Sequence, residues 1–155
     1  MTETTSLFKM ILTDIWEAQT CEIVGQVTIA FAQLEHVLWL SPKRIKKLPF
    51  STWEGMAGRV TIPRRCEQIR QAYATKHMDQ KREAELDRLL DKVIALNDKR
   101  NAIAHGRWGC KKRDGAVISR HRYWKDKDRG TDEAQLMKLR DDIRALRDRL
   151  GRYPW

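Results

Sequence analysis

Three polar residues in the second half of the chain, Arg100, Asn101 and His105, have types and spacing that suit phosphate chemistry. Histidine titrates near neutral pH and can give or accept a proton. Arginine keeps its charge and binds phosphate oxygens in a fork. No carboxylate cluster accompanies the histidine, so the set does not resemble a metal site. It suits RNA cleavage by the substrate's own 2′-hydroxyl, where the protein supplies only proton transfer and charge stabilisation.

These residues end a predicted helix, over residues 80–105, whose apolar face turns polar. Its apolar stripe consists of Leu86, Leu89, Leu90, Val93 and Ile94. At about 100° per residue, Asn97, Arg100 and Asn101 continue the same face, with His105 at its edge. Polar groups facing a core cost about 1–3 kcal/mol each when unpaired. The pattern therefore predicts that they are paired, or that they line a cleft or an interface.

A simpler interpretation of the same residues stays open. Cations in the last turns of a helix are favoured by the helix dipole. Arg100 and His105 could therefore be caps and ion-pair partners, or part of a buried polar network in a purely structural bundle. Asn101 precedes His105 by one turn, so its amide could orient the imidazole in either case.

The elements that must position this set form an all-α bundle of four to five helices with a small β-hairpin before the last helix. We expect one domain over residues 1–155. The first long helix should run from Thr13 to Leu40 and end at Ser41-Pro42, because proline interrupts helices. A capping-box spacing predicts a short helix from Ser51, and Thr61 with Pro63 predicts another.

The segment after the second long helix carries turn signals. Gly106 directly follows the expected helix end and suits its C-terminal cap. Arg113-Asp-Gly predicts a tight turn between strands over 108–112 and 116–124. The last helix should open with Thr131 as N-cap and end at Gly151; its apolar residues are Leu136, Leu139, Ile143, Leu146 and Leu150.

Basic charge is concentrated in two segments of this chain of net charge +10. Residues 41–82 carry +8 and residues 107–129 carry +6, on either side of a near-neutral segment. Segregated basic charge favours a polyanion such as RNA, although ordinary solubilising charge is the alternative. The expected substrate-binding residues are Arg107, Lys111, Lys112, Arg120 and Arg122. Glu35 either positions the Arg100 guanidinium across the bundle or is a plain surface carboxylate.

Other sequence features argue for a cytoplasmic protein without a cofactor or metal. Cys21, Cys66 and Cys110 are odd in number, far apart and without zinc-ligand spacing, which indicates reduced thiols. The longest strongly apolar stretch, residues 27–32, is far shorter than the ~20 residues of a membrane span. We therefore expect no membrane partner.

The motif Arg100-Asn101-Ala-Ile-Ala-His105 resembles that of the HEPN superfamily, an Arg, often with Asn next, and a His shortly after, near the end of a long helix. The following Gly106-Arg-Trp-Gly, the predicted hairpin and the earlier Phe31-Ala-Gln-Leu-Glu35 are similar to one prokaryotic branch of small HEPN-like proteins. The resemblance covers residues 20 to 125.

The resemblance implies a metal-independent endoribonuclease that works as a homodimer through the helix containing Arg100 and His105. Arg100 would stabilise the phosphate, His105 would move protons and Asn101 would hold geometry. The expected products carry a 2′,3′-cyclic phosphate or its hydrolysed form. Several members are toxins, for which an antitoxin protein is a further partner, or act in phage defence. Others have lost activity and are binding scaffolds, so an inactive dimer that holds RNA or protein is the alternative.

Overall fold

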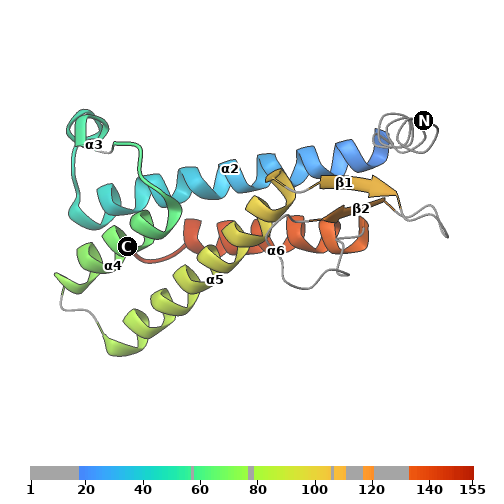
Figure 1. Ribbon diagram of the computed structural model, residues 1–155. Helices are drawn as coiled ribbons and strands as arrows, with labels where there is room; N and C mark the ends of the chain where they lie inside the picture. The colour runs from blue at the N-terminus through green and yellow to red at the C-terminus, as the bar shows by residue number, and fades with distance from the viewer. Residues whose placement is uncertain (1–17, 57, 77–78, 106, 111–116, 121–132) are drawn as a thin grey trace, which may run out of the picture.

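The computed structural model describes residues 18–56, 58–76, 79–105, 107–110, 117–120 and 133–155. In these residues the chain is all-α in its main architecture, with five helices (Figure 1). They are α2 (Ala18–Lys46), α3 (Phe50–Met56), α4 (Ile62–Ala74), α5 (Gln80–His105) and α6 (Glu133–Gly151). Two short strands, β1 (Arg107–Cys110) and β2 (Val117–Arg120), lie between α5 and α6.

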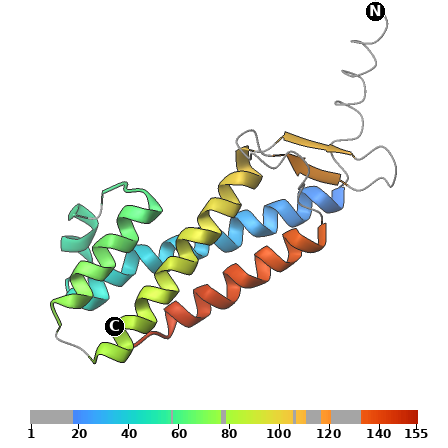
Figure 2. The same cartoon turned by 60° about the horizontal axis from the view of Figure 1, so that its bottom comes forward.

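Among the described elements, the most extensive packing is between α2 and α6, which lie side by side in Figures 1 and 2. Arg140 donates to Gln26 at 2.7 Å, and seven residues later Arg147 donates to Gln33. From the first pair to the second, the residue number rises by seven on both helices, so the two helices run parallel. The buried residues of α6 follow a 3-4-3-4 spacing, which favours this coiled-coil-like packing; they are Leu136, Leu139, Ile143, Leu146 and Leu150.

The remaining helices complete the core around α2. α5 runs back across α2 (Figure 2) and contacts α4, α6 and α2. The apolar stripe predicted from helical spacing for α5 is confirmed by burial, since Leu90 and Val93 are completely buried. Val27, Leu34 and Leu38 of α2 are completely buried as well. One continuous cluster of apolar side chains therefore connects α2, α4, α5 and α6.

The predicted end of the first long helix at Ser41-Pro42 is wrong, because α2 continues through Pro42 to Lys46. Proline removes one backbone hydrogen bond and costs about 3 kcal/mol inside a helix. The added turn buries Pro42 and Ile45, and Ile45 joins the core at 3% exposure. That apolar burial offsets the proline cost. The predicted start at Thr13 lies outside the described residues.

A tight hydrogen-bonded motif ends α2. Lys47 has φ of 53°, in the left-handed region. Its N–H donates to the Arg44 carbonyl at 3.3 Å, and the Leu48 N–H donates to the Lys43 carbonyl at 3.1 Å. These two bonds are those of a Schellman motif, in which glycine usually occupies the left-handed position. The absence of glycine at 47 explains why the sequence does not reveal this end.

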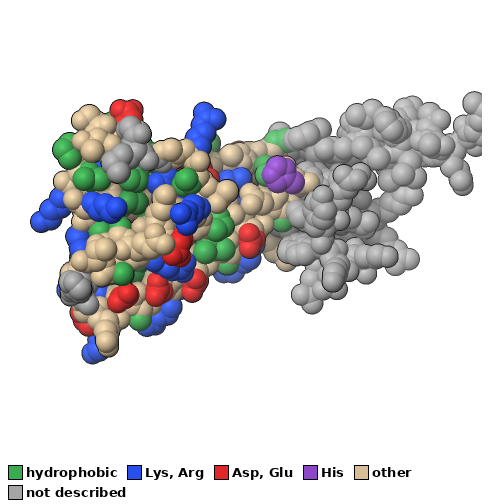
Figure 3. Space-filling view, turned by 60° about the vertical axis from the view of Figure 1, so that its left-hand side comes forward, with side chains coloured by type: hydrophobic (Ala, Val, Ile, Leu, Met, Phe, Trp, Pro, Cys, Tyr) green, Lys and Arg blue, Asp and Glu red, His purple; other side chains and the backbone are tan. Residues whose placement is uncertain are grey.

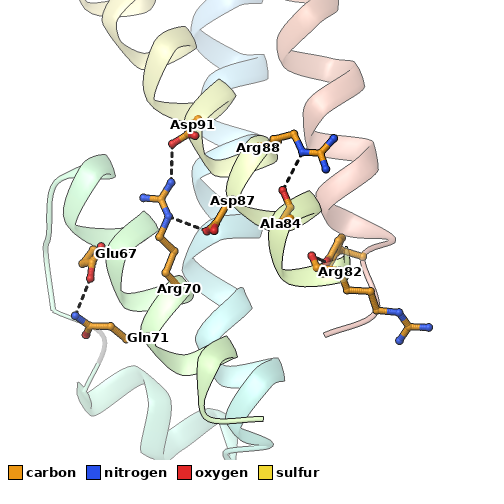
Figure 4. Close-up of polar contacts among 9 residues, drawn as sticks. Glu67, Arg70, Gln71, Arg82, Ala84, Asp87, Arg88 and Asp91 are labelled. Carbon is orange, nitrogen blue, oxygen red and sulfur yellow. Dashed lines mark hydrogen bonds and ion pairs between the residues drawn. The ribbon is translucent and has the colours of Figure 1, made fainter. Parts of the chain in front are cut away.

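The predicted start of α4 is confirmed, and α4 is tied to α5 by an arginine. Thr61 is the N-cap, and its side chain accepts a hydrogen bond from the Arg64 N–H. Figure 4 shows Arg70 of α4 between two carboxylates of α5, with Nε 3.1 Å from Asp87 and Nη2 2.6 Å from Asp91. The short helix expected near Ser51 is present as α3.

β1 and β2 pair antiparallel, with Arg107 opposite Arg120 and Cys110 opposite Val117. The segment 111–116, which holds the predicted Arg113-Asp-Gly turn, lies outside the described residues, so the β-hairpin stays a prediction. Thr131, the expected N-cap of the last helix, also lies outside them. The predicted end of that helix at Gly151 is confirmed.

Within the described residues, Cys21–Lys46 of α2 is the stretch long and apolar enough, by length and composition alone, to cross a membrane. Core helices of soluble proteins pass the same test. α2 buries one face against α4, α5 and α6, as a core helix does. The expected cytoplasmic location and absence of a membrane partner stay predictions.

Candidate functional site

The exposure of the polar residues at the end of α5 increases toward the C-terminus of the helix. Asn97 is buried at 7% exposure, Arg100 and Asn101 are half-buried, and Ala104 and His105 are exposed. The sequence pattern predicts that this face continues toward the core, and this holds as far as Asn97. Beyond it the buried side of the helix is the one that carries Leu96 and Ile103. The polar residues therefore border solvent rather than forming a buried network.

Arg100 is held in place by two residues of α2. Its Nη2 donates to Glu35 Oε1 at 3.0 Å. Its guanidinium carbon lies 4.6 Å from the centre of the Phe31 ring, a cation–π contact. Of the two interpretations of Glu35, the ion pair across the bundle is the one found. Because a guanidinium has five N–H donors and this bond uses one of them within the described residues, donors remain for a phosphate.

Arg100 lines a groove of about 630 Å³ between α2, α5 and the start of α4. We call it the α2–α5 groove. Its walls are formed by Glu35, His36 and Trp39 of α2, by Asn97, Arg100 and Asn101 of α5, and by residues 58–63 and Arg65. Three arginines and one carboxylate line it among the described residues, so it is electropositive. Such a groove suits a polyanionic ligand.

Arg65 is the most deeply buried of these arginines, at 5% exposure. It donates to Gln68 Oε1 at 2.9 Å and to the Gly58 carbonyl at 3.2 Å, and it lies 5.4 Å from the Trp53 ring centre. Burial lowers the pKa of its guanidinium below the ordinary value for arginine. The bond to Gly58 holds that residue against α4, so Arg65 shapes the wall of the groove.

His105 is the last residue of α5, and the structure does not bring it into the groove with Arg100. Five residues along a helix turn the side-chain direction by about 140°. Within the described residues, no hydrogen bond joins the Asn101 amide to the His105 imidazole. Within one chain, Arg100 and His105 therefore lie on different faces of α5 and do not point toward the same site.

The other expected substrate-binding residues lie beyond β1. Arg107 and Arg120 are partners in the β1–β2 register, so the fold brings these two basic positions together. Lys111, Lys112 and Arg122 lie outside the described residues. Among the residues that are described, no group of three or more His, Cys, Asp or Glu side chains could hold a metal ion.

Sequence reasoning offered Glu35 of α2 as a partner of Arg100 but missed the contribution of His36, Trp39 and the α3–α4 connection to the groove. His36 and Trp39 line it, and the ring centres of these two residues are 6.0 Å apart with nearly parallel planes. Their i, i+3 spacing could have indicated this contact, because such residues are neighbours on a helix surface. Nothing in the sequence pattern indicates that Arg59 and Arg65 line the same groove as Arg100.

Comparison with protein-family models, with curated proteins and with solved structures found no match.

Proposed function

We propose that this chain is a metal-independent endoribonuclease of HEPN type that cleaves RNA by attack of the substrate's 2′-hydroxyl. The observation that carries the proposal is the placement of Arg100. Its guanidinium is oriented by Glu35 and Phe31 and lies in the wall of an electropositive groove. A charged fork fixed in advance is what stabilises a phosphorane-like transition state.

In the proposed reaction the 2′-oxygen loses its proton and forms a new bond to phosphorus. The bond from phosphorus to the 5′-oxygen breaks, and the leaving oxygen takes up a proton. The products are a 2′,3′-cyclic phosphate and a 5′-hydroxyl, so atoms and charge balance without water or an oxidant. Arg100 stabilises the charge on the non-bridging oxygens, and His105 transfers protons.

The angular separation of Arg100 and His105 supports a homodimer. A twofold axis near the end of α5 would place the Arg100 of one copy near the His105 of the other in one shared cleft. His105 is exposed and therefore accessible to a second copy. We expect a dimer mass in light scattering at micromolar concentration, and a clean monomer would contradict this arrangement.

The test is cleavage of labelled RNA by purified protein in the presence of EDTA. His105→Ala should abolish cleavage and keep most RNA affinity, because a single imidazole adds little to binding. Arg100→Ala should lose cleavage and some affinity, since hydrogen bonds to charged groups contribute about 1.5–3 kcal/mol. Asn101→Ala should fall between wild type and these two. Arg88→Ala, at an exposed arginine elsewhere on α5, is the matched control.

The second candidate is an inactive dimeric scaffold that binds RNA or protein. The ion pair between Arg100 and Glu35 favours it, because a guanidinium already compensated by a carboxylate is also a structural feature. RNA binding and cleavage by wild-type protein separate the enzyme from the scaffold. Thermal unfolding of the variants separates both from a purely structural role. If wild-type protein binds RNA as a folded dimer and never cuts it, the scaffold is correct. If variant effects only track lost stability, the role is structural.

A further inference from the structure

An aromatic cluster at the other end of the α2–α5 groove has no part in the chemistry proposed for Arg100. The Trp39 ring lies 5.8 Å from the Phe50 ring and 6.0 Å from the Trp53 ring, both of α3. These two contacts are edge-on or tilted, at 66° and 59°. α3 therefore holds the Trp39 ring in a fixed plane.

The His36 ring is offset from this fixed ring and nearly parallel to it, with the two ring centres 6.0 Å apart. The two ring planes differ by 18°, and His36 is exposed at the groove wall. Because His36 is exposed, its imidazole ring remains accessible to a third ring beside that of Trp39. An exposed aromatic stack of this kind is a platform on which an unpaired nucleobase can stack.

Positive charge accompanies the aromatic cluster. Arg59 is exposed at the groove rim and makes no hydrogen bond or ion pair with a residue that the structure describes. Lys43 lies 5.6 Å from the centre of the Phe50 ring. Figure 3 shows Lys and Arg side chains over this end of the molecule, with hydrophobic side chains between them. Basic groups beside stacked rings are the combination with which proteins bind single-stranded nucleic acid.

The spacing of Glu35 and Trp39 along α2 relates this platform to Arg100. Glu35, which holds Arg100, precedes Trp39 by one turn of α2, about 6 Å along the helix axis. One nucleotide of an extended strand spans that distance. Asn97 and Asn101 line the groove on its α5 side, and their amides offer both donors and acceptors to the edge of a base.

We propose that the His36–Trp39 stack is the base-binding subsite of the α2–α5 groove and that the ligand is single-stranded RNA. An unpaired base stacks on the exposed ring of His36, and Arg59 binds an adjacent phosphate. The position of the neighbouring phosphate at Arg100 rests on the proposed function. A double helix does not fit this subsite, because its bases are already stacked on one another. An acidic peptide would use the arginines and leave the stacked rings without a role.

The experiment measures binding of the full chain to a fluorescent single-stranded 2′-O-methyl RNA by anisotropy. This ligand cannot be cut by 2′-hydroxyl attack, so the result does not depend on catalysis. His36→Leu keeps an apolar side chain without a ring face and should weaken binding about tenfold, within the range for one stacked base. His36→Phe should bind as well as wild type. Circular dichroism and the melting temperature show whether each variant is folded.

An abasic oligonucleotide identifies the stacking contact directly. It should bind wild type as weakly as the normal oligonucleotide binds His36→Leu, and the two losses should not add, because they remove the same contact. Arg59→Gln should lower affinity and reduce the salt slope, and the matched change Arg88→Gln on α5 should do neither.

Three results would overturn this subsite. They are binding of His36→Leu within twofold of wild type, equal affinity for duplex RNA, and displacement of the oligonucleotide by an equal concentration of poly-glutamate peptide. Base-dependent binding without any cleavage of ordinary RNA would contradict the enzyme proposal and leave the subsite intact.

Discussion

The Arg100 guanidinium donates a hydrogen bond of 3.0 Å to the Glu35 carboxylate across 65 positions of sequence. The side chains of the pair are 27% and 40% exposed, so solvent screens their attraction. The pair is therefore a weak source of stability. Its consequence for function is orientation, because it fixes one edge of the guanidinium while the Phe31 ring packs against the group.

Glu35→Ala should lower RNA cleavage about tenfold and change the free energy of unfolding by less than about 1 kcal/mol. Glu35→Gln keeps an oxygen acceptor for Arg100 and should lose less activity. Single-turnover cleavage rates and urea unfolding provide the two measurements. Glu83→Gln, at an exposed position in the first turn of α5, is the control and should leave cleavage unchanged. Unaltered cleavage by Glu35→Ala would remove the orienting role.

RNA affinity should fall steeply with salt. Single-stranded nucleic acid gives a slope of about −0.7 for each neutralised phosphate. If Arg59 and Arg100 of the groove each neutralise one, a fourfold increase from about 50 to 200 mM salt weakens binding about sevenfold. The basic segments 41–82 and 107–129 can only steepen this dependence. A dissociation constant that is the same at both salt concentrations would refute the electrostatic argument.

Lys47→Gly should stabilise the protein by about 0.5–1 kcal/mol. The left-handed backbone at φ of 53° is strained for lysine and free of strain for glycine. This gain exceeds the entropy that glycine adds to the unfolded chain. Lys92→Gly, inside α5, should have the opposite sign and cost about 1 kcal/mol. Urea midpoints of the two variants check both signs, and a destabilising Lys47→Gly would show that the lysine side chain has a role of its own.

Stability should fall between about pH 9 and pH 11 because of Cys66. Burial raises the pKa of this completely buried thiol from 9.0 to about 11. The thiol therefore keeps its proton in the folded chain at pH values where it ionises in the unfolded chain. Its contribution is fully present below pH 9 and is lost as the pH rises toward 11, by up to about 3 kcal/mol.

Cys66→Ala should flatten this alkaline slope while lowering stability at neutral pH, because it removes a packed side chain. Burial also raises the pKa of Tyr153, whose loss of stability begins at higher pH, so part of the slope should remain. Urea unfolding at several pH values from 7 to 11 measures both slopes. An identical slope in the variant would assign the alkaline loss to other groups.

Local patterns in the sequence are sufficient to predict most helices of this protein. The apolar residues of α6 repeat at helical spacing and end at a glycine, and Thr61 with Pro63 specifies the start of α4. These signals act within one or two turns, through hydrogen bonds to the chain's own backbone or through one buried face. For the same reason the sequence places Arg100, Asn101 and His105 near the end of one helix.

Tertiary packing determined the contacts between residues that are more than a few helical turns apart in the sequence. α2 passes through Pro42 because the turn beyond it buries Ile45 in a core made by other helices. Burial across the bundle also selects Glu35 as the partner of Arg100 and seats Trp39 against α3. The energies of these contacts depend on which distant surfaces meet, and helical periodicity contains no information about that choice. The sequence alone therefore determines the residue types available for phosphate chemistry, whereas the folded chain determines the groove that contains Arg100 and leaves His105 outside it.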